Sequence, residues 1–107
     1  MQRIGFQLQV RPELLDAYKA HHAAVWPEMR AALTRHGWHN YTLFVRADGL
    51  LFGYVEVTAG FAAALAGMAT EEVNARWQEL MAPYFVGIGR GAADAHMLQL
   101  EEVFHLD

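Results

Sequence analysis

The chain has 107 residues and a net charge of −4, which indicates one small, mildly acidic domain spanning residues 1–107. It contains no cysteine and no cluster of Lys or Arg, which excludes disulfides and thiolate metal sites and argues against a nucleic-acid partner. No apolar stretch reaches the roughly 18 residues that a membrane span requires, so we expect a soluble, cytoplasmic protein without a membrane partner.

The first third of the chain predicts a strand followed by a helical region. Residues 3–10 alternate between apolar and polar side chains, which predicts a half-buried strand. From residue 12 to about residue 24, apolar side chains recur at helical spacing, and Pro27 interrupts or restarts this helix. Gly37 is a typical residue to end it.

Two further strands follow and are joined by a hairpin. Residues 39–47 and 50–58 both predict strands, and Asp48-Gly49 between them is typical of a tight turn. The strand at 50–58 is apolar on both faces, and a layer of helices covers only one of them. Hydrophobic residues make up 54% of the chain, which is more than so small a domain easily buries. We therefore expect the second face to meet another subunit in a homodimer.

The last third predicts two helices and a final strand. The Ala-rich segment 60–69 predicts a short helix, and Thr70 is placed to cap a longer one that Pro83 limits. Residues 87–95 contain three glycines and predict a loop, and residues 96–106 alternate again as a strand. The order strand, helix, strand, strand, helix, strand predicts an α+β, ferredoxin-like antiparallel sheet with its helices on one face.

Several polar side chains interrupt these apolar faces and are candidates for chemistry. Tyr18 and His22 lie one turn apart on the predicted first helix and point the same way. Asn40 and Tyr41 open the second strand. A carboxylate on an apolar strand face requires a partner or a wet cavity, because burying it alone is costly. The remaining candidates are Trp77, Gln78, Glu56 and Glu102.

Each candidate has a simpler explanation when it is taken singly. A histidine on an apolar helix face is more often a hydrogen-bonded core residue than a catalyst, and Tyr or Trp more often packs. Together, aromatic rings, a histidine, an amide and carboxylates around one concavity are typical of a carbohydrate site. The histidines lack metal-binding spacing, and no phosphate-loop, dinucleotide or nucleophile-elbow motif is present. We therefore expect no metal and no cofactor.

A combination of short motifs extends along the chain. Tyr18 and His22 on the first helix are followed by VWPE at 25–28, HG at 36–37, HNY at 39–41, LLF at 50–52, Val55-Glu56, RW at 76–77 and EVF at 102–104. With these motifs the chain resembles the L-rhamnose mutarotase family over nearly its whole length. Two features depart from the family pattern. Gln78 stands where the family often has a second tryptophan, and 87–93 is Gly-rich where the family often has an Asn/Pro-rich segment.

The resemblance implies a ferredoxin-like dimer that interconverts the α and β anomers of L-rhamnose by acid–base ring opening and closure, without a cofactor. It implies that His22 is the proton donor and that Tyr18, Tyr41 and Trp77 bind the sugar. A histidine suits this chemistry because it titrates near neutral pH. From the residue pattern we add Gln78, Asn40 and Glu102 as substrate-binding candidates, with Glu102, a tyrosine or water as the partner base.

Three alternatives stay open at this point. The preferred sugar is another 6-deoxyhexose such as L-fucose, or the chain is a ligand-sensing dimer that binds without catalysing. The same split fold also serves small monooxygenases, with or without haem, that act on aromatic substrates. Anomer exchange measured with both sugars separates the first two alternatives, and bound haem or oxygen uptake would indicate the third.

Overall fold

The computed structural model describes residues 1–86 and 97–107, and within them it has one four-stranded sheet and four α-helices. The strands are β1 (Gln2–Gln9), β2 (Trp38–Val45), β3 (Leu50–Val57) and β4 (Leu98–Leu100). The α-helices are α1 (Leu15–His22), α2 (Pro27–Arg35), α3 (Phe61–Ala69) and α4 (Glu72–Met81). Short 3₁₀ turns, η1 (Pro12–Leu14) and η2 (Ala82–Tyr84), precede α1 and follow α4. No helix among these residues is long and apolar enough to cross a membrane.

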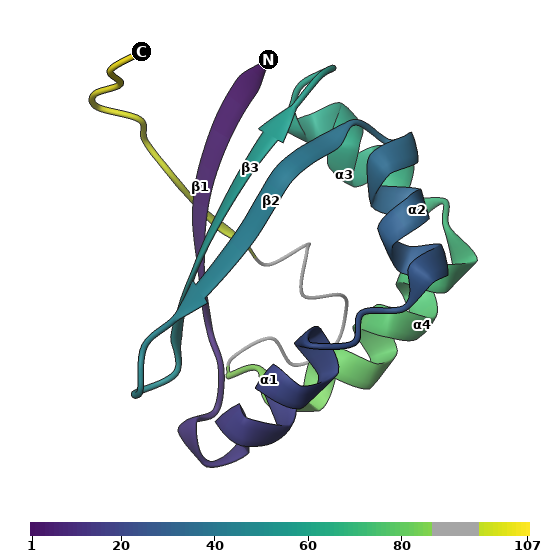
Figure 1. Ribbon diagram of the computed structural model, residues 1–107, viewed down its shortest axis with the longest axis vertical. Helices are drawn as coiled ribbons and strands as arrows, with labels where there is room; N and C mark the ends of the chain where they lie inside the picture. Colours follow the sequence, from purple (N-terminus) through teal and green to yellow (C-terminus); the bar gives the residue numbers. More distant parts are fainter. Residues whose placement is uncertain (87–96) are drawn as a thin grey trace.

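The sheet is antiparallel throughout and has the strand order β2-β3-β1-β4. All four α-helices lie against the same face of this sheet, and both chain termini lie at one end of it (Figure 1). The predicted α+β class is therefore confirmed. The opposite face, which we call the outer face, carries no helix in the described part of the chain.

The core forms between the helices and the inner face of the sheet. The predicted alternation of the first strand is confirmed, because Ile4, Phe6 and Val10 are buried and Phe6 is 0% exposed. The ring of Phe6 lies directly over Gly53 of β3, where a Cβ atom would overlap it. β1 and β3 pair in register here, with Phe6 opposite Gly53, so the glycine makes room for the ring.

The helical region between β1 and β2 consists of more separate segments than the spacing predicts. The single helix predicted from residue 12 to 24 is the 3₁₀ turn η1 followed by α1, which ends at His22. Pro27 starts α2 at its first turn, where the missing proline N–H costs no hydrogen bond. Gly37 follows α2 with a φ of 81°, so the predicted stop is confirmed.

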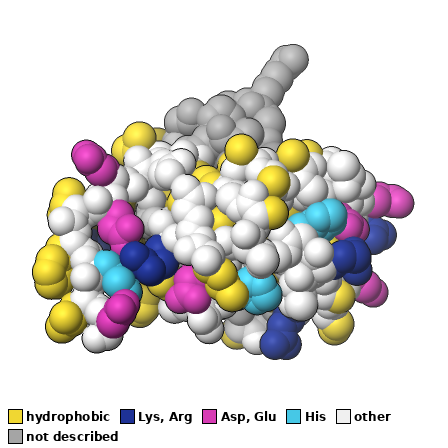
Figure 2. Space-filling view, turned by 90° about the horizontal axis from the view of Figure 1, so that it is seen from above, with side chains coloured by type: hydrophobic (Ala, Val, Ile, Leu, Met, Phe, Trp, Pro, Cys, Tyr) yellow, Lys and Arg dark blue, Asp and Glu magenta, His cyan; other side chains and the backbone are white. Residues whose placement is uncertain are grey.

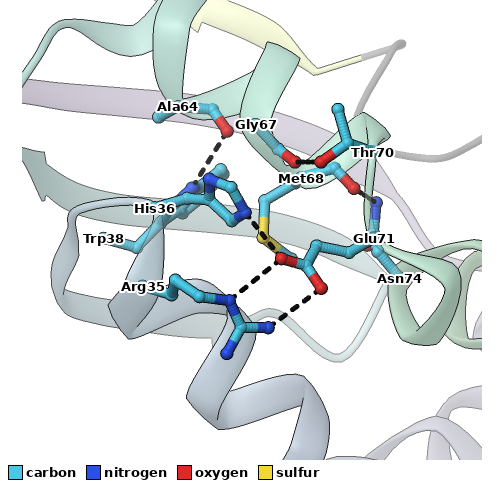
Figure 3. A network of polar contacts seen from close by, with 9 residues as sticks. All are labelled: Arg35, His36, Trp38, Ala64, Gly67, Met68, Thr70, Glu71 and Asn74. Atoms are coloured by element: carbon cyan, nitrogen blue, oxygen red, sulfur yellow. Dashed lines mark hydrogen bonds and ion pairs between the residues drawn. The ribbon is translucent and has the colours of Figure 1, made fainter.

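The predicted cap at Thr70 is wrong. Thr70 ends α3 and its hydroxyl donates to the Gly67 carbonyl at 2.7 Å. Glu71 is the residue at the N-cap of α4, and it makes no side-chain cap bond. Its carboxylate instead accepts hydrogen bonds from Arg35 and His36 at the end of α2 (Figure 3). The pattern of a polar residue followed by acidic residues correctly predicted a helix start. The Glu71 carboxylate, however, joins the start of α4 to the end of α2 instead of capping α4.

The final strand is shorter than predicted. β4 spans three residues and pairs with Gly5–Gln7 of β1, at the edge of the sheet. Beyond Leu100 the chain has no strand structure, so the predicted extent of 96–106 is wrong at its C-terminal end. The side chains of Leu98 and Leu100 share a face as the alternation predicts, and that face is the outer one, where no helix covers them. The loop predicted at 87–95 lies outside the described residues.

Exposed apolar side chains mark the outer face and the C-terminal segment. Phe44 of β2 and Phe52 of β3 are 60% and 38% exposed, with ring centroids 6.4 Å apart. The other large apolar side chains exposed on this side are Leu98, Leu100, Val103, Phe104 and Leu106. Figure 2 shows hydrophobic side chains along the left margin of the molecule, the side on which the sheet lies in Figure 1. The two-faced strand predicted at 50–58 is thus found with one face buried and one face open.

Candidate active site

A large cavity of about 850 Å³ lies between the helices and β2. Residues of the α1–α2 connection, α2, β2, α3 and α4 line it, together with Met97. Its aromatic lining is Trp38, Tyr41 and Trp77, and its polar lining is His22, Arg30, Thr34, Asn40, Asn74 and Gln78. A smaller cavity of about 250 Å³ adjoins it between α1 and the β2–β3 hairpin and shares His22, Ala23 and Leu43. The mixed aromatic and polar wall suits a small polar ligand with apolar patches.

His22 is the last residue of α1, and it lines both cavities. Its Nδ1 lies 3.0 Å from the carbonyl oxygen of Tyr18, one turn earlier on the same helix. A carbonyl only accepts hydrogen bonds, so Nδ1 carries a proton and donates it. In the neutral ring Nε2 then has a free lone pair, and it is the nitrogen available for proton transfer.

Two rings hold the His22 imidazole in place. The Tyr18 ring stacks on it with centroids 4.2 Å apart, and Trp77 meets it edge-on at 5.4 Å. Burial lowers the pKa of His22, the Tyr18 carbonyl opposes this by accepting from Nδ1, and nearby His21 lowers the pKa further. His22 is therefore mainly neutral at neutral pH, with Nε2 ready to accept a proton.

Tyr18 lies deeper than the sequence predicts for a ligand-binding residue. Its side chain is in the core, 4% exposed, and it lines only the smaller cavity. Phe85 packs edge-on against its ring at 5.8 Å. Burial raises the pKa of the Tyr18 hydroxyl, which therefore stays protonated and acts as a hydrogen-bond donor rather than a base.

Asn40 and Tyr41 reach the large cavity through an irregularity in β2. The pairing with β3 shifts register between His39 and Thr42, and Asn40 has a φ of 50°, a conformation that Asn tolerates better than most residues. The Asn40 side-chain amide donates to Glu56 at 3.1 Å. Tyr41 follows Asn40 in this bulge. Its ring lies on the inner side of the sheet, with its centroid 5.0 Å from that of the Trp38 ring. Both candidates are thus brought to the cavity.

Trp77 and Gln78 come from α4 and complete the wall opposite β2. The Trp77 ring is buried and lies edge-on to Trp26 at 5.0 Å as well as to His22. Gln78 is half-buried, and its amide nitrogen donates to the Oδ1 atom of Asn74 at 3.1 Å. The structure thus brings together His22, Tyr41, Asn40, Trp77 and Gln78 around one cavity.

Glu102 is not brought to either cavity. Its carboxylate accepts a hydrogen bond from Arg3 Nε at 2.8 Å, and both side chains are substantially exposed. The apolar strand face that made Glu102 a candidate does not form, because β4 ends at Leu100. Glu56 has partners of its own, since Tyr54 donates to it at 2.8 Å and Asn40 donates to its other oxygen.

Sequence reasoning missed four aromatic or polar residues that line the large cavity, which are Arg30, Thr34, Trp38 and Asn74. Asn74 lies in the buried stripe of α4 between Val73 and Trp77, and it is the polar residue with the lowest exposure among those described. Its position in an otherwise apolar stripe was a signal that could have been used. Trp26 was noticed only as part of a motif, because the ring contact with Trp77 depends on how α1 and α2 meet.

The described residues offer no group of three or more His, Asp or Glu side chains placed to hold a metal ion. Several side chains with groups suited to chemistry line the large cavity. These are the His22 imidazole, the Arg30 guanidinium, the hydroxyls of Thr34 and Tyr41, side-chain amides and indole rings.

Comparisons with known proteins agree along the whole chain. A family model described as L-rhamnose mutarotase matches residues 3–106. The L-rhamnose mutarotase of Oceanobacillus iheyensis is 36% identical over 109 residues, with 100% of each chain covered. That of Escherichia coli O127:H6 is 32% identical over 109 residues, with 99% of each chain covered. Among solved structures, an L-rhamnose mutarotase from Formosa agariphila has a TM-score of 0.82 at 25% identity, with 100% of each chain covered.

Proposed function

The chain belongs to the L-rhamnose mutarotase family, and from that premise we propose how its cavity interconverts the α and β anomers of L-rhamnose. The enzyme is an isomerase, and its reaction opens the sugar ring at the bond between C1 and O5 and closes it again. One proton must leave the hydroxyl on C1 and one must reach the ring oxygen. The observation that carries the proposal is His22, held at the cavity wall with Nδ1 bonded to the Tyr18 carbonyl, which leaves Nε2 unprotonated in the neutral ring.

His22 moves the proton between two oxygens of the same carbon. Nε2 of the neutral ring takes the proton from the anomeric hydroxyl as the C1–O5 bond breaks and the C1 carbonyl forms. The protonated ring then gives that proton to O5, so the open-chain sugar is neutral and His22 is restored. Rotation about the C1–C2 bond turns the other face of the carbonyl to O5, and the reverse steps close the ring as the other anomer.

This path includes the donor role at the ring oxygen that the family resemblance implies for His22. It also makes a separate partner base unnecessary, because O1 and O5 are bonded to one carbon. Glu102 is left out of the path, since Arg3 holds its carboxylate outside both cavities. General acid–base catalysis of this kind supplies about 10²–10⁴-fold, which suits a reaction that already occurs in water.

The other cavity residues bind and orient the sugar. Trp77 offers an indole surface for the apolar C–H face of the ring, and Tyr41 and Gln78 offer polar groups for hydroxyls. Asn40 shapes the bulge that presents Tyr41, and its amide is engaged by Glu56. Tyr18 supports the His22 ring from the core side and has a protonated hydroxyl at the smaller cavity.

The test is the variant His22→Asn, whose side-chain amide retains a donor for the Tyr18 carbonyl but has no titrating nitrogen. Anomer exchange of L-rhamnose, measured by saturation-transfer NMR, should slow by about 10²–10⁴-fold while the thermal unfolding profile is kept. The matched control is His105→Asn, which changes an exposed histidine far from the cavity and should leave the rate unaltered. Exchange at the wild-type rate in His22→Asn would rule out the role of His22.

We further propose that the fold is the ferredoxin-like arrangement and that two copies pair through the outer faces of their sheets. The order β2-β3-β1-β4, antiparallel at every step, is the order that such a split arrangement requires, which supports the first part. The exposed Phe44 and Phe52 on an uncovered sheet face support the second part. A cytoplasmic location stays a prediction that cell fractionation tests.

A further inference from the structure

Two amide side chains stand one turn apart on α4 beside Trp77. Asn74 is 4% exposed and Gln78 is half-buried, and both line the large cavity. Gln78 Nε2 donates to Asn74 Oδ1 at 3.1 Å, so the two amides form a pair. A buried amide on an apolar helix stripe costs free energy unless its hydrogen bonds are made, which points to a use for this one.

The structure anchors Asn74 from the other side. Its Nδ2 donates to the carbonyl oxygen of Met68, near the end of α3, at 3.1 Å (Figure 3). The corner between α3 and α4 is itself joined to α2, because Glu71 accepts from Arg35 at 2.9 Å and from His36 at 2.7 Å. Asn74 is therefore fixed in position and in the rotation of its amide plane.

A fixed Asn74 restricts Gln78 in turn. The bond to Asn74 Oδ1 sets which way the Gln78 nitrogen points, and hence where its oxygen lies. A polar group held in one orientation forms a hydrogen bond only with a ligand hydroxyl at one position. A side chain that rotates freely can form the bond with a hydroxyl at either position, and it therefore distinguishes the two poorly. The amide pair is thus suited to discriminate between sugars that differ only in the orientation of their hydroxyl groups.

We propose that Asn74 is a positioning residue that holds the Gln78 amide so that Gln78 distinguishes epimeric hydroxyl groups of the bound sugar. The inference rests on the proposed function, because it places the sugar against Trp77 and His22. L-rhamnose and L-fucose have the same atoms and differ in the orientation of two ring hydroxyls. A directional hydrogen bond distinguishes two such sugars, because only one of them places its hydroxyl where the bond can form.

The first test replaces Gln78 by methionine, which keeps the length of the side chain and removes both polar atoms. We expect kcat/KM for L-rhamnose over L-fucose, from anomer exchange at several sugar concentrations, to fall by about tenfold, the effect of one hydrogen bond. The change should appear mainly in KM, since proton transfer at His22 is untouched. The matched control is Glu79→Met, the same kind of change at the next, exposed position of α4, and it should keep the wild-type ratio.

The second test separates positioning from direct contact. Asn74→Leu should lower the selectivity ratio as Gln78→Met does, and adding it to Gln78→Met should change the ratio no further. A ratio that falls again in the double variant would mean that Asn74 contacts the sugar itself, which contradicts the positioning role. If Asn74→Leu does not fold, Gln78→Glu is the second way to break the hydrogen bond between residues 78 and 74. Its carboxylate has no N–H to donate to Asn74 Oδ1, so the selectivity ratio should also fall in this variant.

The outcomes distinguish this proposal from the proposed function. A wild-type protein that accelerates exchange of both sugars equally, or a Gln78→Met variant with the wild-type ratio, overturns the role of the amide pair and leaves His22 standing. A His22→Asn variant with full activity overturns the proposed mechanism, and the amide proposal with it.

Discussion

At the scale of single residues, the hydrogen bond from His22 Nδ1 to the Tyr18 carbonyl decides what the site can do. The i, i+4 spacing predicted that the two side chains share a face of the helix, and this is confirmed by their stacked rings. The spacing did not predict that the imidazole bonds to its own helix. That bond depends on a side-chain rotation which Trp77, from a distant part of the sequence, helps to fix.

The direction of the His22 pKa shift leads to a pH prediction. Burial lowers the pKa of His22 below its usual 6.5, so the neutral form, which accepts the anomeric proton in the proposed mechanism, persists into mildly acidic solution. The enzymatic rate, after subtraction of the spontaneous rate, should therefore be level around neutral pH and fall only below about pH 6.5. Measuring kcat/KM for anomer exchange from pH 4.5 to 8 checks this. A rate that instead falls as the pH rises through this range would mean that protonated His22 is the form that starts the reaction.

The same shift predicts the sign of the stability change. Because the unfolded chain takes up a proton at this histidine more readily than the folded protein, His22 weakens the fold as pH falls below about 6.5. The effect is absent above that pH, where both states carry a neutral ring. The enzymatic rate and the free energy of unfolding are thus both expected to decrease as the pH falls and His22 is protonated.

At the scale of secondary-structure elements, the sequence was most informative where a local rule acts. Pro27, Gly37 and the Asp48-Gly49 turn each fix the backbone locally, and all three lie at element ends as predicted. Thr70 was misassigned because two helices meet there, and the Arg35–Glu71 pair that joins them links residues 36 positions apart. Such contacts leave no local pattern in the chain.

The end of β4 is a second case in which a local pattern was insufficient. Residues 101–106 continue the apolar alternation, yet β4 stops at Leu100 and its pairing with β1 covers Gly5–Gln7 alone. Alternation predicts a side chain's direction in a strand, but whether a strand forms depends on a neighbour. The Glu102 candidate failed for this reason.

The close approach of β1 and β3 predicts a sensitive position in the sheet. A Cβ atom at Gly53 would overlap the Phe6 ring, which is fully buried and has little room to move. Gly53→Ala should lower the free energy of unfolding by about 1–3 kcal/mol, as overpacking of a core does. Urea denaturation followed by circular dichroism measures this, with Gly5→Ala as the control. A Cβ atom at Gly5 reaches only ordinary packing distance from Phe52, so its effect should be smaller.

At the scale of the whole molecule, the two faces of the sheet have different surroundings. The inner face contributes Tyr41 to the cavity and packs under the helices. The outer face presents Phe44 and Phe52 to solvent in the single chain. The surplus of hydrophobic residues and the two-faced strand at 50–58 predicted a surface of this kind on β3, and the part that Phe44 of β2 contributes required the fold.

The proposed homodimer gives a prediction at this scale. Phe44→Glu combined with Phe52→Glu would bury two carboxylates per chain in the interface and should dissociate the dimer. Sedimentation velocity should report a mass near twice 12.0 kDa for the wild type and near 12.0 kDa for the variant. Leu80→Glu, at an exposed apolar residue of α4 on the helical side, is the matched control and should leave the mass unaltered. A wild type that sediments as a monomer would contradict the proposed interface.

The covering of the sheet on a single face has an evolutionary consequence. In β2 after the bulge, consecutive residues alternate between the inner and the outer face of the sheet, as Tyr41 and Thr42 do, so a substitution can change one face without the other. A one-residue insertion or deletion that no bulge absorbs has no such freedom, because it would move the apolar set beyond it to the wrong side. We therefore expect changes of chain length to be tolerated in the connections and at the bulge, and the rest of each strand to vary by replacement.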